Sequence, residues 1–191
     1  MTAYHSTLPD QFLFEEKRDD FWVFAYGSLM WRPDFEFLEK RRARLQGYSR
    51  SLCIYSWVHR GTREVPGLVF GLDNGGFCDG FAYKLAPEHQ RPAVDMLRAR
   101  ELVTNVYKES HAAVALLEGD TRTVDALLYV VDHDHDQYAG SLPVEELERL
   151  VRQGKGGAGE NVDYVLSTYD HLQAEGIDDE QLEALCGRLR N

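Results

Sequence analysis

The pattern of apolar and polar positions divides the chain into a strand-rich first part and a helical last part. Residues 21–26 (FWVFAY) form a short aromatic and β-branched run that ends at a Gly-Ser pair, as a buried strand entering a turn does. Turn-forming residues at 73–76 (DNGG) and 118–120 (EGD) predict two hairpins. Further strands are predicted at 45–58, 65–72, 77–85, 106–117 and 121–131.

Helical periodicity begins at Pro87, near a first turn that tolerates its missing N–H, and runs to about Glu101. The glycine-rich segment 154–160 lacks the pattern of a phosphate-binding loop, so we expect a flexible interhelical loop. Because strands come first and helices last, an α+β fold is favoured over alternating α/β units. Three more helices are predicted, at 144–153, 162–173 and 180–189.

Length and composition indicate a globular protein. Of its 191 residues 43% are hydrophobic and 28% are charged, which suffices for one hydrophobic core. We expect an N-terminal arm at 1–20 followed by a single domain at 21–191. The formal net charge of -11 disfavours sequence-independent binding to nucleic acid and to anionic membranes.

Cysteine usage and the first residues indicate a cytoplasmic protein. The three cysteines form no CxxC pair, and an odd number cannot all pair within one chain, which fits a reducing compartment. The N-terminal segment lacks the basic and apolar regions of a signal peptide, and no window contains the roughly 20 apolar residues of a spanning helix. We therefore expect no membrane insertion.

Metal and nucleophile-elbow motifs are missing from the sequence. There is no HExxH and no GxSxG segment. The run at 132–136 (DHDHD) could bind a divalent cation, but neighbouring residues of one segment rarely complete a coordination shell by themselves. A solvated loop is the preferred interpretation, and we predict no metal site.

Two features carry candidate chemistry. Gly27 after the first strand allows a sharp turn whose backbone N–H groups could bind an anion, although from these residues alone a purely structural turn is the favoured explanation. Ala93, Leu97 and Glu101 follow one another at i+4 spacing, so Glu101 continues an apolar stripe and should point inward. Burial and the helix C-terminus would raise the pKa of Glu101 toward the range of a general base, whereas Arg98 or Arg100 could lower it if either side chain folds back. From the residues alone, a structural role and a catalytic role for Glu101 are equally supported.

The order of several short motifs resembles the ChaC-type gamma-glutamylcyclotransferases over residues 21–175. The Arg100-Glu101 pair is similar to the family's catalytic Arg-Glu. The other matching segments are FAYGSLMWRPDF at 24–35, QGYSRS at 46–51, HRGT at 59–62, VPGLVFGL at 65–72, YAG at 138–140 and ENVDY at 160–164.

This resemblance implies a mixed β-sheet closed into a small barrel with flanking and C-terminal helices, and an enzyme without metal or coenzyme. It implies cleavage of glutathione to 5-oxoproline and cysteinylglycine, with Glu101 transferring the proton. The backbone of Gly27, Ser28 and Leu29 would hold the gamma-glutamyl group. Less specific substrate contacts are implied for Tyr26, Tyr138, Asn161 and Tyr164, where structural roles are equally open. The partner is then a small molecule, and we expect a monomer or a weak dimer.

Two alternatives remain open at this point. The same fold could act on other gamma-glutamyl amino acids or on gamma-glutamylamines. A non-catalytic regulator of cation transport would need Glu101 only as a buried acid.

Overall fold

The computed structural model describes residues 18–191. The N-terminal arm predicted at 1–20 lies almost wholly outside these residues, and the division into arm and domain stays a prediction. The strands are β1 (Phe21–Ala25), β2 (Glu39–Ser56), β3 (Gly67–Leu85), β4 (Tyr107–Leu116), β5 (Thr123–Val131), β6 (Lys155–Gly156) and β7 (Gly159–Glu160). The α-helices are α1 (Pro87–Glu101), α2 (Val144–Gln153), α3 (Asn161–Ala174) and α4 (Glu180–Leu189).

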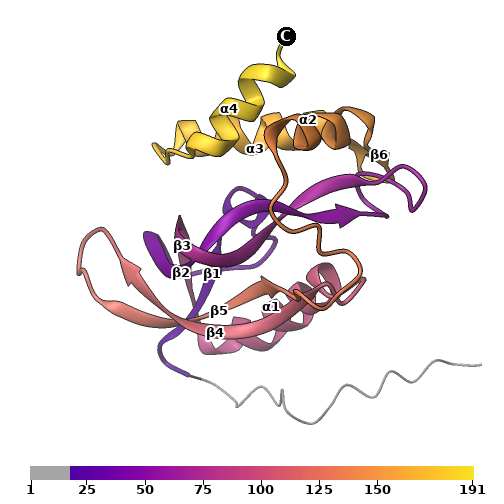
Figure 1. Ribbon diagram of the computed structural model, residues 1–191. Coiled ribbons are helices and arrows are strands. Elements are labelled where there is room, and N and C mark those ends of the chain that lie inside the picture. The colour runs from indigo at the N-terminus through magenta and orange to yellow at the C-terminus, as the bar shows by residue number, and fades with distance from the viewer. Residues whose placement is uncertain (1–17) are drawn as a thin grey trace, which may run out of the picture.

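Five strands close into a barrel in the order β1-β3-β2-β4-β5 (Figure 1). Most neighbouring pairs are antiparallel, but β1 and β5 close the barrel in parallel, with Trp22 opposite Ala126. Large apolar side chains such as Trp22, Leu45 and Leu127 are buried in its core. The structure confirms the expected α+β fold with a mixed, closed sheet.

The hairpin predicted at residues 73–76 is wrong. β3 runs through these residues as one strand of 19 residues and stays paired with β2, so that Tyr48 lies opposite Asn74. Gly75 and Gly76 have positive φ angles of 101° and 66°, and the register shifts between Gln46 and Tyr48. The turn-forming residues therefore make a bulge that bends the strand, because the long β2 offers a pairing partner on both sides of it.

Most other predicted elements agree with the structure. The hairpin between β4 and β5 and the helices α1, α2 and α4 are confirmed within a residue or two. The segment at 154–160 differs from the expected loop, because Lys155–Gly156 and Gly159–Glu160 pair as a two-stranded sheet. Within residues 18–191, no helix is long and apolar enough to span a bilayer.

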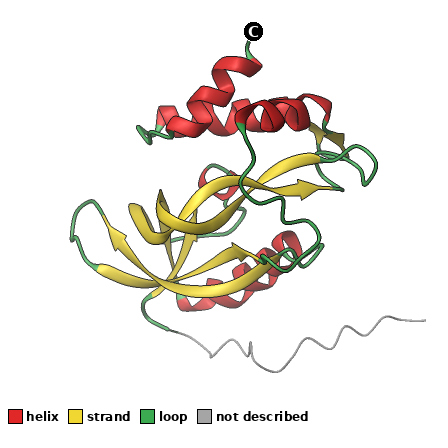
Figure 2. Cartoon of the chain, in the orientation of Figure 1, coloured by secondary structure: helices red, strands yellow, loops and turns green. Residues whose placement is uncertain are grey.

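The helices lie on different sides of the barrel (Figures 1 and 2). α2, α3 and α4 contact one another, and α2 and α3 pack against β3. α1 lies apart from them, next to β4 and β5 in this view. Glu101 is the last residue of α1, so the packing of this helix decides where its carboxylate points.

Candidate active site

The turn after β1 presents backbone N–H groups that have no partner. Gly27 (φ -130°, ψ -136°) precedes a short 3₁₀ helix, η2 (Ser28–Met30), in which the Met30 N–H donates to the Gly27 carbonyl at 2.9 Å. Among residues 18–191, the amides of Gly27, Ser28 and Leu29 find no hydrogen-bond acceptor. Consecutive free amides at such a turn are suited to hold an anion.

Glu101 lies where the apolar stripe of α1 places it. Ala93 and Leu97 are buried, and the Glu101 side chain at the end of the same stripe is 19% exposed. Burial raises the pKa of Glu101, and the positive charge of Arg100 lowers it in part. A carboxylate whose pKa is raised in this way can both accept and return a proton near neutral pH.

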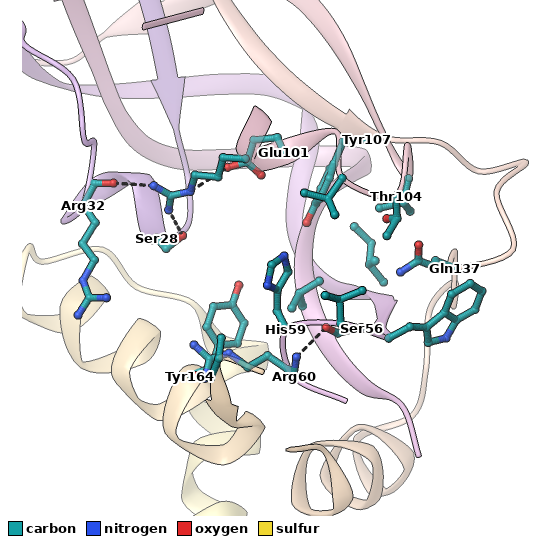
Figure 3. A pocket seen from close by; sticks show the side chains of 18 of the residues that line it. Ser28, Arg32, Ser56, His59, Arg60, Glu101, Thr104, Tyr107, Gln137 and Tyr164 are labelled. Atoms are coloured by element: carbon teal, nitrogen blue, oxygen red, sulfur yellow. Dashed lines mark hydrogen bonds and ion pairs between the residues drawn. The ribbon is translucent and has the colours of Figure 1, made fainter. Parts of the chain in front are cut away.

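Arg100 connects the end of α1 to the turn after β1, and the dashed lines in Figure 3 mark its contacts with the labelled Ser28 and Arg32. Its Nη2 donates to the Ser28 hydroxyl at 2.7 Å, and its Nη1 donates to the Arg32 carbonyl at 3.0 Å and to the Asp34 carboxylate at 2.9 Å. Its Nε lies 3.4 Å from Glu101 Oε1. One guanidinium thus fixes the acid and the turn relative to each other.

Glu101 and Ser28 line a cavity of about 660 Å³ (Figure 3). A smaller recess of about 50 Å³ is lined by Glu101 together with Gly27, Ser28 and Leu29. The larger volume is within the range of cavities that bind small molecules. The turn and the acid that the sequence singled out therefore face one site.

Four tyrosines line the recess, among them Tyr26, Tyr107 and Tyr164, whose hydroxyl groups are neutral. Tyr107 donates to the Phe70 carbonyl at 2.6 Å, and Tyr164 accepts from the Phe70 N–H at 3.5 Å. Tyr26 donates to the Tyr129 carbonyl at 3.4 Å. Burial raises the pKa of Tyr164 to about 12 and that of Tyr26 and Tyr107 well above the usual value, so all three keep their protons.

Two residues implied by the resemblance do not line either cavity. The Tyr138 hydroxyl lies 3.1 Å from both oxygens of Asp73. Asn161 is fully buried, where its Oδ1 accepts from the Leu68 N–H at 2.6 Å and its Nδ2 donates to the Leu68 carbonyl at 2.8 Å. Asn161 therefore completes the hydrogen bonding of β3 at Leu68, and the substrate contact implied by the resemblance stays a prediction.

Arg50 supports the turn from inside the protein and was not singled out from the sequence. Its side chain is only 4% exposed, and its Nε donates to the carbonyl of Tyr26, the residue before Gly27, at 2.6 Å. Its Nη2 donates to the Asp79 carbonyl at 2.5 Å, and its Nη1 pairs with Asp179 at 3.2 Å. The partners lie 24 to 129 residues away, so no local pattern could reveal them.

The acidic and histidine-rich segment at 132–136 forms ordinary surface contacts. Asp132 pairs with Lys108 at 2.6 Å, and His133 lies 2.8 Å from Asp73. In the described part of the chain, no group of three or more His, Cys, Asp or Glu side chains is placed to hold a metal ion.

Comparison with known proteins decides the family. A family model described as ChaC-like protein matches residues 21–191. The chain belongs to the ChaC-like family. This confirms the family that the sequence motifs indicated, and the match extends beyond residue 175 to the C-terminal helix.

Similar ChaC-like and related proteins carry enzyme names. The Escherichia coli glutathione-specific gamma-glutamylcyclotransferase is 33% identical over 164 residues, which cover 86% of this chain and 70% of that protein. The human glutathione-specific gamma-glutamylcyclotransferase 1 is also 33% identical, over 168 residues that cover 86% of this chain and 76% of that protein.

A solved structure confirms the fold of this ChaC-like chain. The crystal structure of a yeast gamma-glutamyl cyclotransferase specific to glutathione superposes with a TM-score of 0.82 at 21% identity. The superposition covers 91% of this chain and 96% of the yeast chain. At this identity the likeness concerns the fold alone.

Proposed function

We propose that the protein is a gamma-glutamylcyclotransferase that cleaves glutathione to 5-oxoproline and cysteinylglycine. The observation that carries the proposal is the placement of Glu101, a largely buried acid with a raised pKa, in the same recess as the unpartnered amides of Gly27, Ser28 and Leu29. Family membership and the names of the similar proteins support the same reaction.

In the proposed complex, the turn amides bind the α-carboxylate of the gamma-glutamyl group. The adjacent ammonium group then lies beside Glu101, which accepts one proton and leaves a neutral amine. The amine nitrogen attacks the gamma-carbonyl carbon, and the bond from that carbon to the cysteinyl nitrogen breaks. Glu101 delivers this proton to the departing cysteinyl nitrogen and then passes a second proton to it from the attacking nitrogen, which keeps one hydrogen as the lactam N–H. Cysteinylglycine therefore leaves with an ammonium group, the acid ends in its starting form and no water is consumed.

Orientation supplies much of the acceleration in this scheme. The attacking amine and the gamma-carbonyl belong to one flexible chain. Holding that chain curled keeps the two reacting groups close and correctly oriented, which lowers the entropic part of the barrier. Tyr26, Tyr107 and Tyr164 surround the recess with neutral hydroxyl groups that can orient the substrate without competing for the proton. We further propose that the protein works in the cytoplasm as a monomer or weak dimer.

Product analysis tests the proposal directly. Purified protein incubated with glutathione in the presence of a chelator should release equal amounts of 5-oxoproline and cysteinylglycine. Glu101→Gln should abolish the release, whereas Asp95→Asn should not, because Asp95 is an exposed carboxylate on the same helix that, among residues 18–191, pairs only with Arg91 at the surface. Equal turnover by the wild type and Glu101→Gln would remove the assigned role.

The same assay separates the alternatives. Release from gamma-glutamylalanine at a higher kcat/KM than from glutathione would assign the enzyme to other gamma-glutamyl amino acids. Absence of turnover with every gamma-glutamyl compound would favour a non-catalytic regulator.

A further inference from the structure

Arg60 stands out on the cavity wall because its guanidinium is held in place without a carboxylate partner. Its Nη1 donates to the carbonyls of Ala158 at 2.6 Å and Glu160 at 3.1 Å, and its Cζ lies 5.0 Å from the centre of the Tyr164 ring. Figure 3 shows the side chain running toward Tyr164. Within residues 18–191 Arg60 forms no ion pair, although Asp163 lies near enough to act on its charge.

The surroundings of Arg60 are positive for so acidic a protein. Arg32 lines the same cavity, also forms no ion pair with the described residues, and acts on Arg60 as a like charge. Three arginines and two carboxylates line this cavity, whereas the whole chain carries a formal charge of -11. Partial burial of Arg60 disfavours its charged form and lowers its pKa. An anionic ligand binds most favourably to a cation that is already oriented, partly desolvated and without a counter-charge.

The proposed reaction supplies such an anion. Glutathione has two carboxylates, and the turn amides account for the one on the gamma-glutamyl residue. We propose that Arg60 binds the second carboxylate, at the glycine end of the leaving dipeptide, with Arg32 adding positive potential. This inference rests on the proposed function and deepens it: the cavity selects gamma-glutamyl compounds with a free carboxylate on the leaving group over gamma-glutamylamines.

A comparison of two substrates tests the inference. Glutathione and its C-terminal glycine amide share the reacting end and differ only in the second negative charge. The wild type should prefer glutathione by about 10- to 100-fold in kcat/KM, as expected for hydrogen bonds to a charged group. The difference should lie mainly in KM, because the contact is present in both the ground state and the transition state.

Variants of Arg60 identify the group responsible. In Arg60→Met the preference should disappear, and in Arg60→Lys it should be partly kept, because lysine retains the charge but not the two-pronged geometry. Arg91→Met is the matched control: it removes an exposed arginine that, in the described part of the chain, pairs only with Asp95, and it should leave the preference unchanged.

The ratio between the substrates is the readout, because Arg60 also contacts the 154–160 segment and its loss can lower all activity together. The same ratio is measured as binding affinity in Glu101→Gln, where turnover is not needed. Equal values for the two substrates in the wild type, or a full preference in Arg60→Met, would overturn the inference. Absence of turnover together with a persisting binding preference would instead contradict the proposed function alone.

Discussion

Replacing Arg50 by methionine tests whether the active-site turn depends on a buried charge behind it. The substitution removes the Arg50 donor from the carbonyls of Tyr26 and Asp79 and from Oδ2 of the 16%-exposed Asp179 carboxylate. Each hydrogen bond to a charged group contributes about 1.5–3 kcal/mol, and removing one partner of a buried ion pair costs about 3–5 kcal/mol. Methionine recovers part of the packing of Arg50, and the Asp179 carboxylate stays partly hydrated. We therefore expect the free energy of unfolding to fall by about 3–5 kcal/mol in total.

Urea unfolding of matched variants measures this loss. Arg188 pairs with Glu145 and Glu148 while it is 42% exposed, so Arg188→Met should cost less than about 1 kcal/mol. Asp179→Asn keeps an oxygen for the cap of α4 but removes the charge that faces Arg50. In a double-mutant cycle, Arg50 and Asp179 should therefore be non-additive by more than about 0.5 kcal/mol.

Arg50→Met also tests whether the buried Arg50 side chain orients the turn that is proposed to bind the substrate. With the Tyr26 carbonyl released, the amides of the following turn are less well oriented, so KM for glutathione should rise in Arg50→Met and stay constant in Arg188→Met. A stability loss as small as that of Arg188→Met, with an unchanged KM, would refute the reasoning.

Two further predictions concern Glu101 and Asn161. Burial raises the pKa of Glu101 in the folded state, so its contribution to stability is full below the unfolded pKa of about 4.3 and is lost as the pH rises through the folded pKa. Glu101→Gln should therefore raise Tm relative to the wild type at pH 8, and the gain should vanish near pH 4; a constant difference would contradict the assignment. Asn161→Leu leaves both backbone groups of Leu68 unpaired and should cost about 2–4 kcal/mol in urea unfolding. Its KM for glutathione should not change, and a raised KM at full stability would place Asn161 at the substrate.

The elements that sequence pattern predicted well are those whose signal is local. The run at Phe21–Ala25 and the helix from Pro87 to Glu101 each carry their own apolar period and their own end signals. The bend at 73–76 failed because the same residues suit a hairpin turn and a β-bulge. Only the 18-residue partner strand β2 decides between the two, and pairing over such a length is not a local property.

The residues of the candidate site also divide into those that local sequence pattern located and those that it did not. The i+4 apolar stripe of α1 was sufficient to predict that Glu101 points inward, and Gly27 was sufficient to predict the turn after β1. Arg50 and Arg60 act through backbone carbonyls far along the chain, which no residue spacing records. The resemblance implied a substrate contact for Asn161, which stays a prediction, and the structure adds that its amide bonds to Leu68 of β3.

Arg100 makes the proton affinity of Glu101 depend on what occupies the turn. In the free protein its charge, 3.4 Å from Glu101 Oε1, opposes the effect of burial and keeps the pKa from rising further. The same guanidinium holds the Ser28 hydroxyl at 2.7 Å, beside the amides proposed to bind the substrate carboxylate. A carboxylate docked there offsets part of the positive charge of Arg100, and this opposes the lowering of the Glu101 pKa by the substrate ammonium group. The zwitterionic substrate thus supplies with its own carboxylate a charge that helps Glu101 keep its strength as a base.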